Sequence, residues 1–273
     1  MPDTSAYIMG HDDRERRRLA LQASILNPFT DHLLRRAGIS TGMRVLDIGC
    51  GVGDVSLLAA RIVGQSGRVT SLDFDGQALK TLKDRANAEV LGNIACVEGN
   101  VHDWDSGHRF DAVIGRHILI HSKNPLEVLQ RTAGMLQPRG LAVFHEYDFS
   151  VMHRAWPPAP LRDWVMGVFA RFFEAVCFSN MGSRLWTLLV NAGFENPDCR
   201  AEYPIGGGSD SPYFEWIVES LRSILPRALA LGMVSEGEMG IDTLEERLRA
   251  ENQATKSCVP APTMIGAFAR LKG

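Results

Sequence analysis

A glycine-rich turn that joins an apolar run to an amphipathic segment constrains this chain more than any other feature. Residues 45–54 read V-L-D-I-G-C-G-V-G-D, and the helical pattern 55–63 follows. An apolar run of this kind is typical of a buried strand, and glycines let the backbone lie directly against a ligand. A second strand pattern, 68–72, ends in Asp73, where doubly wound folds carry the acid that binds a ribose. The pattern predicts a bound adenosine cofactor.

The glycine spacing distinguishes between adenosine cofactors. Dinucleotide-binding turns read G-x-G-x-x-G, whereas this turn has Gly49, Gly51 and Gly53, and Asp54 stands where that motif needs its last glycine. No Gly-Lys-Ser/Thr follows, which excludes a Walker loop. An acid at the turn disfavours a pyrophosphate. A cofactor without phosphates remains, and Asp47 suits one that carries an ammonium group.

The turn and four later segments resemble the class I S-adenosylmethionine-dependent methyltransferases. Residues 45–54 resemble their first motif and 69–75 (V-T-S-L-D-F-D) their second. The likeness continues through V-E-G-N-V (97–101), F-D-A-V-I-G-R-H (110–117) and L-Q-P-R-G-L-A-V-F (136–144), and covers about residues 40–150. The small-molecule branch, with enzymes of quinone and natural-product biosynthesis, is the most similar. This resemblance implies a Rossmann-like, doubly wound α/β fold with a seven-stranded sheet, its last strand antiparallel, and a helical lid or insertion.

Apolar periodicity and turn signals divide the chain into parts. Pro28 predicts two helices within an amino-terminal arm. Two S/D-x-x-E patterns, at 235–238 and 242–245, predict capping boxes in a helical insertion. The expected parts are an arm or lid at 1–40, a methyltransferase core at 41–205 with an aromatic lid helix at about 157–178, the insertion at 206–258, and a final core strand at 259–273.

Composition fits a cytoplasmic small-molecule enzyme. The net charge of −3 over 273 residues offers nothing to attract nucleic acid. Five cysteines without C-x-x-C spacing indicate reduced thiols. No signal peptide or membrane-spanning run is apparent, and the histidines lack metal-ligand spacing. We expect a small-molecule substrate, no nucleic-acid or membrane partner and no metal; a homodimer is compatible with this picture.

The resemblance implies S-adenosyl-L-methionine as methyl donor and S-adenosyl-L-homocysteine as product. The glycines would pass the methionine and ribose, Asp73 would bind the ribose hydroxyls, and Phe74 would lie beside the adenine. Asn100 stands where the family usually has Asp, so a charged contact to the adenine edge is replaced by an amide. An amino-terminal arm resembles a segment that folds over the donor in related enzymes. The candidate donor contacts are Tyr7, Gln22, Asp47, Gly49, Gly51, Gly53, Asp73, Phe74, Asn100, Val101 and Arg116.

Acceptor chemistry is assigned to the ends of the fourth and fifth strands. His117 is the first candidate for a general base, because an imidazole can take a proton from an OH, NH or activated carbon, although it could instead only orient a substrate. Glu146 is the second candidate, and His145 lies beside it on the opposite face. The candidate acceptor contacts are His121, for which a structural role is the alternative, and Trp164, Phe169, Phe172, Tyr213 and Trp216. These rings predict a hydrophobic, aromatic acceptor, with C-, N- and O-methylation all open.

Three other functional classes are weighed against this one. A nucleic-acid amino-methyltransferase would carry Asp/Asn-Pro-Pro-Tyr/Phe after the fourth strand, where this chain has G-R-H-I (115–118). A non-catalytic or cyclising S-adenosylmethionine-binding protein stays open, because a fold does not fix a function. A nicotinamide-dependent oxidoreductase is the third alternative.

Overall fold

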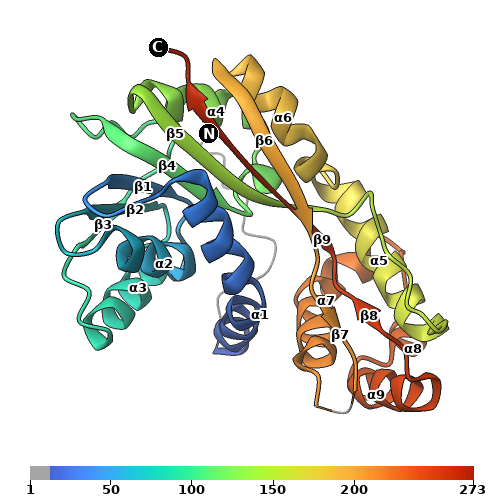
Figure 1. The fold of residues 1–273 in the computed structure, drawn as a ribbon. Coiled ribbons are helices and arrows are strands. Elements are labelled where there is room, and N and C mark those ends of the chain that lie inside the picture. Colours follow the sequence, from blue (N-terminus) through green and yellow to red (C-terminus); the bar gives the residue numbers. More distant parts are fainter. Residues whose placement is uncertain (1–12, 209) are drawn as a thin grey trace. The chain divides into compact units, whose positions relative to one another are not determined.

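A computed structural model describes residues 13–208 and 210–273, which fall into two compact units (Figure 1). The helical unit comprises Met1–Leu26, Phe149–Val176 and Tyr203–Thr263, of which residues 1–12 and 209 are not described. The sheet unit comprises Asn27–Asp148, Cys177–Glu202 and Met264–Gly273. Helix α1 (Asp13–Ala37) contributes residues to both units.

The sheet unit is built on a seven-stranded sheet in the order β3-β2-β1-β4-β5-β9-β6. Neighbouring strands from β3 to β5 run parallel, and β6 and β9 pair antiparallel. This confirms the predicted Rossmann-like sheet with an antiparallel last strand. The strands are β1 (Arg44–Ile48), β2 (Arg68–Asp73), β3 (Ile94–Glu98), β4 (Phe110–Arg116), β5 (Leu136–Asp148), β6 (Phe194–Glu202) and β9 (Thr263–Leu271).

Helices cover both faces of this sheet, with α2 and α3 on one side and α4 and α6 on the other (Figure 1). They are α2 (Asp54–Val63), α3 (Gly76–Ala88), α4 (Pro125–Gly134) and α6 (Met181–Asn191), with the short 3₁₀ helix η1 (Leu119–His121) after β4. Burying each large apolar side chain contributes about 1.5–3 kcal/mol. One apolar core joins Leu33, Leu34 and Ala37 of α1, Val55, Leu58, Ala59 and Ile62 of α2, and Val45, Val69, Ala112, Ile114, Leu141 and Val143 of the sheet.

The helical unit contains the predicted aromatic helix, which the structure shows as α5 (Pro160–Val176). Its ring face is buried, with Phe173 stacked on Phe149 at 4.2 Å and edge-on to Phe172 at 5.5 Å. The carboxylate of Glu251 accepts the first backbone N–H groups of α5, which fixes its start. The remaining elements are α7 (Pro212–Ala230), α8 (Glu236–Met239), α9 (Leu244–Thr255) and a two-stranded sheet of β7 (Ile205–Gly206) and β8 (Val259–Pro260).

Two local predictions are wrong for identifiable reasons. The amino-terminal arm has one helix, not two, because Pro28 removes a single N–H and the apolar residues around it keep α1 continuous. The capping box predicted at Asp242 does not form, because α9 begins at Leu244 and its N-cap is Thr243; the Asp242 carboxylate accepts from Arg222 at 2.7 Å. The other predicted box, between Ser235 and Glu238, is confirmed. Among residues 13–208 and 210–273, no helix is both long enough and apolar enough to cross a bilayer.

Candidate functional site

In the glycine turn after β1, one glycine has room for a side chain and two do not. Gly49, Gly51 and Gly53 all have positive φ, at +61°, +52° and +89°. A Cβ at Gly53 would lie 2.1 Å from Leu82 Cδ1, and one at Gly49 would lie 2.4 Å from Ile118 Cδ1. A Cβ at Gly51 would lie within 4 Å of no atom in the described part of the chain. Gly49 and Gly53 are therefore needed for packing, whereas Gly51 borders space that a ligand can fill.

Asp73 stands beside that open position. It ends β2 and is 8% exposed; its Oδ2 accepts the Gly51 N–H at 2.7 Å and its Oδ1 the Asp75 N–H at 2.9 Å. A carboxylate offers about four lone-pair sites, so each oxygen can accept a further hydrogen bond. The next side chain, Phe74, is 61% exposed. An open glycine, a carboxylate with spare acceptor capacity and an exposed ring together fit a ribose and an adenine.

Asp47 lies beneath the turn rather than on its surface. Its side chain is buried, and its Oδ2 accepts a hydrogen bond from the Ser56 hydroxyl at 2.6 Å. Ser56 also hydrogen-bonds Ser71 at 2.7 Å. Burial raises the pKa of Asp47 to about 7. The residue is thus engaged in tying β1, β2 and α2 together, and its contact with an ammonium group stays a prediction.

Arg116 is the centre of a buried polar network. Its Nη1 donates to Asn27 Oδ1 at 2.9 Å and to Thr30 Oγ1 at 3.0 Å, and its Nη2 lies 3.6 Å from Asp54. The Arg85 guanidinium lies 2.8 Å from the other oxygen of Asp54. Two cations therefore compensate Asp54, so its expected repulsion of a pyrophosphate is weaker than the sequence suggested. The other argument against a dinucleotide is unaffected: the turn has Asp54 where the dinucleotide-binding motif has its third glycine.

Asn27 and Thr30 are residues that the sequence interpretation missed. They lie on α1 beside Pro28, and Thr30 also hydrogen-bonds His145 Nδ1 at 3.1 Å. Thr30 is 1% exposed and His145 3%. The available signal was a threonine at a buried position of an otherwise apolar helix face, since such a hydroxyl needs a partner.

His117 follows β4 in an unusual conformation. It has φ of +56°, and its N–H donates to the His145 carbonyl at 3.0 Å. The imidazole stacks on Tyr147 with centroids 4.1 Å apart and rings inclined by 11°. Its Nε2 lies 3.3 Å from the Met264 sulfur. The ring is half-buried and is held by the neighbouring strand ends.

Glu146 points the opposite way from His145 and Tyr147 and is fully buried. Its Oε1 accepts the N–H groups of Ile118 and Leu119 at 2.9 and 2.8 Å, and Oε2 that of Ile120 at 3.3 Å. Burial raises the pKa of Glu146 to about 8, against these three donors, which favour the charged form. Both carboxylate oxygens are therefore engaged with the backbone that follows His117.

Burial also lowers the pKa of two histidines near this edge of the sheet. It lowers the pKa of His121 to about 4, and together with the charge of Arg116 it lowers that of His145 to about 3. The ordinary histidine pKa is about 6.5, so the unfolded chain binds more protons than the folded one below that pH. Each residue thus contributes stability that is present above about pH 6.5 and is lost as the pH falls toward the folded pKa.

We expect both imidazoles to stay neutral at pH 5 in the folded protein. Nitrogen-15 NMR of the ring nitrogens measures this directly, because charged and neutral imidazoles give distinct shifts. The same nitrogens in urea-unfolded protein should titrate near pH 6.5, as ordinary histidines do, to within about one unit. A charged His145 in the folded protein at pH 5 would contradict its burial against Arg116.

The predicted adenine-edge residues form a turn at the end of β3. Asn100 is exposed, and its side-chain oxygen accepts the His102 N–H at 3.0 Å. Its carbonyl accepts the N–H groups of Asp103 and Trp104. The Val101 carbonyl is held by Arg131 at 2.9 Å. The NH₂ group of the Asn100 side chain could donate a hydrogen bond to a ligand. The contact with adenine stays a prediction.

In the helical unit, the predicted ring residues have different surroundings. Phe169 and Phe172 are buried, and Trp164 is half-buried. Trp216 packs edge-on to Tyr213 at 6.2 Å, and its buried Nε1–H has no hydrogen-bond partner among the described residues. The lid candidate Gln22 is 9% exposed and accepts from Arg18 at 2.9 Å. Tyr7 lies outside the described residues.

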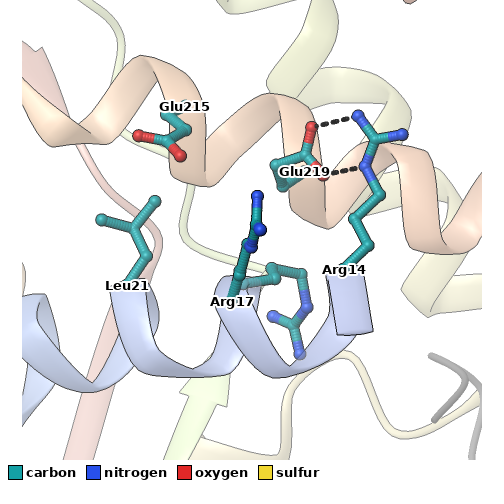
Figure 2. A pocket seen from close by; sticks show the side chains of 6 residues that line it. Arg14, Arg17, Leu21, Glu215 and Glu219 are labelled. Carbon is teal, nitrogen blue, oxygen red and sulfur yellow. Dashed lines mark hydrogen bonds and ion pairs between the residues drawn. The ribbon is translucent and has the colours of Figure 1, made fainter. Parts of the chain in front are cut away.

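A charged cleft also lies in the helical unit, between α1 and α7 (Figure 2). The Arg14 guanidinium donates to both oxygens of Glu219, at 2.5 and 2.8 Å, across this cleft (Figure 2). The lining residues are Arg14, Arg17, Arg18, Leu21, Glu215 and Glu219. In the described part of the chain, no three His, Cys, Asp or Glu side chains gather so as to hold a metal ion.

Comparison with known proteins places this chain in a family. Residues 39–185 match a family model described as "Methyltransferase domain". A 2-phytyl-1,4-naphtoquinone methyltransferase of Nostoc is 33% identical over 116 residues, which are 42% of this chain and 51% of that protein. A probable cobalt-precorrin-6B C(15)-methyltransferase of Thermoplasma acidophilum is 41% identical over 76 residues, 28% of this chain and 38% of that protein. The chain thus spans about half or less of the curated relatives it matches.

The solved structures agree on the fold. A SAM-dependent methyltransferase from Aquifex aeolicus superposes with a TM-score of 0.54 over 96% of this chain and 100% of that one, at 14% identity. At that identity the likeness concerns the arrangement of strands and helices alone.

Proposed function

Since the chain belongs to the methyltransferase-domain family, in the class I S-adenosylmethionine-dependent group, we propose that it transfers a methyl group from S-adenosylmethionine to a hydrophobic, aromatic small molecule. The observation that carries the proposal is the group of Gly51, Asp73 and Phe74. It combines open space at the turn, a carboxylate with lone pairs to spare, and an exposed ring. These are the features that a phosphate-free adenosine cofactor requires.

When bound, the donor supplies a methyl group on a sulfonium, which an acceptor atom attacks in line. The residues of this chain would bind the donor and remove a proton from the acceptor. Asp73 would accept hydrogen bonds from the ribose hydroxyls, and Phe74 would pack on the adenine. The imidazole of His117, whose orientation Tyr147 fixes, would take a proton from the acceptor where the acceptor atom carries one.

Replacing Asp73 by Asn tests the donor site. Hydrogen bonds to a charged acceptor are worth about 1.5–3 kcal/mol and neutral ones about 0.5–1.5, so we expect donor affinity to fall about tenfold. Isothermal titration calorimetry with S-adenosylmethionine measures the change. Asp75→Asn is the matched control, because Asp75 caps α3 through Gln77 and Ala78 and has no assigned donor contact. Equal affinities for wild type and Asp73→Asn would remove Asp73 from the site.

The acceptor class is supported by α7 of the helical unit. Trp216 and Ser220 lie one helical turn apart, are 4% and 8% exposed, and carry buried polar atoms with no partner among the described residues. Apolar walls with a few polar anchors are typical of small-molecule sites. An aromatic acceptor that carries a carbonyl or hydroxyl oxygen on its ring would accept a hydrogen bond from the Trp216 N–H. The name of the Nostoc relative specifies a naphthoquinone, which has this chemistry.

Trp216→Phe separates an acceptor contact from a packing role. The Trp216 N–H has no partner among residues 13–208 and 210–273, so its removal should leave the melting temperature within a few degrees of wild type or above it. KM for an oxygen-bearing aromatic acceptor should rise about tenfold, as expected for one lost hydrogen bond of about 1.4 kcal/mol. Trp186→Phe is the control, because Trp186 is 52% exposed on α6 and has no assigned acceptor contact. An unchanged KM with a large loss of stability would make Trp216 a core residue.

Methyl transfer itself is tested with a donor labelled in its methyl group. Quinones, phenols and aromatic amines serve as trial acceptors, and mass spectrometry should find the label on the acceptor with S-adenosylhomocysteine released in equal amount. Conversion of an acceptor without release of S-adenosylhomocysteine would favour cyclisation. Donor binding without any conversion of the panel would favour a binding protein.

A further inference from the structure

The backbone that carries His117 is held in an uncommon conformation. His117 has a left-handed φ of +56°, which residues with a Cβ rarely adopt without support from their surroundings. The chain then turns at once into η1, whose first N–H groups have no partner within the helix itself. The position of the imidazole therefore depends on what satisfies this short stretch of backbone.

That support comes from consecutive residues at the end of β5. The His145 carbonyl accepts the His117 N–H at 3.0 Å, and the Tyr147 ring stacks on the His117 imidazole. Between them, the Glu146 carboxylate accepts the N–H groups of Ile118, Leu119 and Ile120, at 2.8–3.3 Å. Residues 145–147 thus hold residues 117–120 through three kinds of contact: a backbone hydrogen bond, a carboxylate and a ring.

The same contacts argue against Glu146 as a base. Its side chain is 0% exposed, and both oxygens accept backbone hydrogen bonds. A base must reach the proton that it removes, within hydrogen-bond distance or through one water. Glu146 could do so only by releasing backbone N–H groups that would then be buried without a partner.

We infer that Glu146 is a positioning residue: its carboxylate fixes the backbone after His117, and so aims the imidazole that acts in the proposed methyl transfer. This rests on the proposed function for the chemical step, whereas the structural effect on His117 stands independently of it. The pair Glu146–His117 forms one unit in which the first residue acts only through the second.

The test compares Glu146→Gln and Glu146→Ala with Asp148→Asn. Asp148 is the matched control, because it is a buried carboxylate of the same strand whose Oδ2 accepts the Ser183 N–H at 2.7 Å, at the start of a different helix. Nuclear magnetic resonance follows the His117 ring protons, which the stacked Tyr147 ring shifts. Steady-state kinetics with the labelled donor give kcat, KM and their pH profiles.

We expect the His117 ring shift to move toward the value of an unstructured histidine, further in Glu146→Ala than in Glu146→Gln, and not in Asp148→Asn. Turnover should fall between about 10- and 100-fold, as for a misaligned reacting group, while the pH profile of kcat/KM keeps the limb that belongs to His117. The asparagine control should keep both the His117 shift and turnover, whatever stability it loses.

Two results would overturn the inference. One is a folded Glu146 variant with unchanged His117 ring shifts. The other is a turnover loss that removes a limb of the pH profile while the His117 shifts stay constant, which would make Glu146 the base. If neither variant folds, hydrogen exchange of the wild-type Ile118 and Leu119 amides decides, since bonding to a buried carboxylate requires slow exchange and fast exchange refutes it. If wild type transfers no methyl group, the proposed function falls, and the NMR comparison still tests the positioning.

Discussion

His117→Ala should lower turnover by a factor of about 100 or more, which is the usual loss when a general acid or base is removed. The imidazole lies at the end of β4 with its ring stacked on Tyr147, so its removal deletes a proton acceptor and leaves the sheet intact. Steady-state kinetics with labelled donor measure the effect, and the pH profile of kcat/KM should lose its acidic limb. Donor affinity, measured by calorimetry, should change much less.

His102→Ala is the control for that experiment. His102 lies on the surface, 3.3 Å from the Glu127 carboxylate, away from the strand ends that hold His117. Its variant should keep wild-type turnover. Equal activities for the two variants and the wild type would mean that the acceptor needs no base, and His117 would then at most orient a substrate.

Gly53→Ala should mainly lower the stability of the protein, whereas Gly51→Ala should mainly lower its affinity for the donor. At Gly53 the new Cβ would lie 2.1 Å from Cδ1 of the fully buried Leu82, so we expect a stability loss of about 1–3 kcal/mol from overpacking, besides the cost of a positive φ. At Gly51 the new Cβ meets no atom of residues 13–208 or 210–273, and stability should fall only by the backbone cost of about 1–2 kcal/mol. Donor affinity should instead fall, by about tenfold or more, since the methyl group occupies the space proposed for the donor.

Thermal unfolding and calorimetry on both variants test this contrast. We expect a lower melting temperature for Gly53→Ala than for Gly51→Ala. We expect the folded Gly51→Ala protein to bind the donor more weakly than the folded Gly53→Ala protein. A Gly51→Ala variant with wild-type affinity would show that the open space beside the turn is not the donor site.

The sheet and the donor-side motifs could be predicted because they are local. The strand-turn-helix pattern at 45–63 and the acid at Asp73 are each read from a few neighbouring residues, and the parallel order follows from the alternation of strands and helices. The confirmed capping box at Ser235 is local in the same sense.

Contacts between segments distant in the chain could not be predicted from the sequence. The partners of Arg116 are Asn27, Thr30 and Asp54, and no rule of sequence spacing specifies these hydrogen bonds or the ion pair with Asp54. Glu146 could be identified as a strand-end carboxylate, whereas its hydrogen bonds to residues 118–120 depend on where η1 begins. The capping box expected at Asp242 does not form, because α9 begins at Leu244 and Thr243 is its N-cap. The Asp242 carboxylate instead binds Arg222, 20 residues away in the chain.

We propose that the turn around Gly51, with Asp73 and Phe74, binds S-adenosylmethionine. Calorimetric titration of the wild-type protein with S-adenosylmethionine, and separately with a nicotinamide dinucleotide, measures this binding. We expect saturable binding of one S-adenosylmethionine per chain, weakened in Asp73→Asn and Gly51→Ala, and no binding of the dinucleotide. Saturable binding of the dinucleotide in place of S-adenosylmethionine would contradict it.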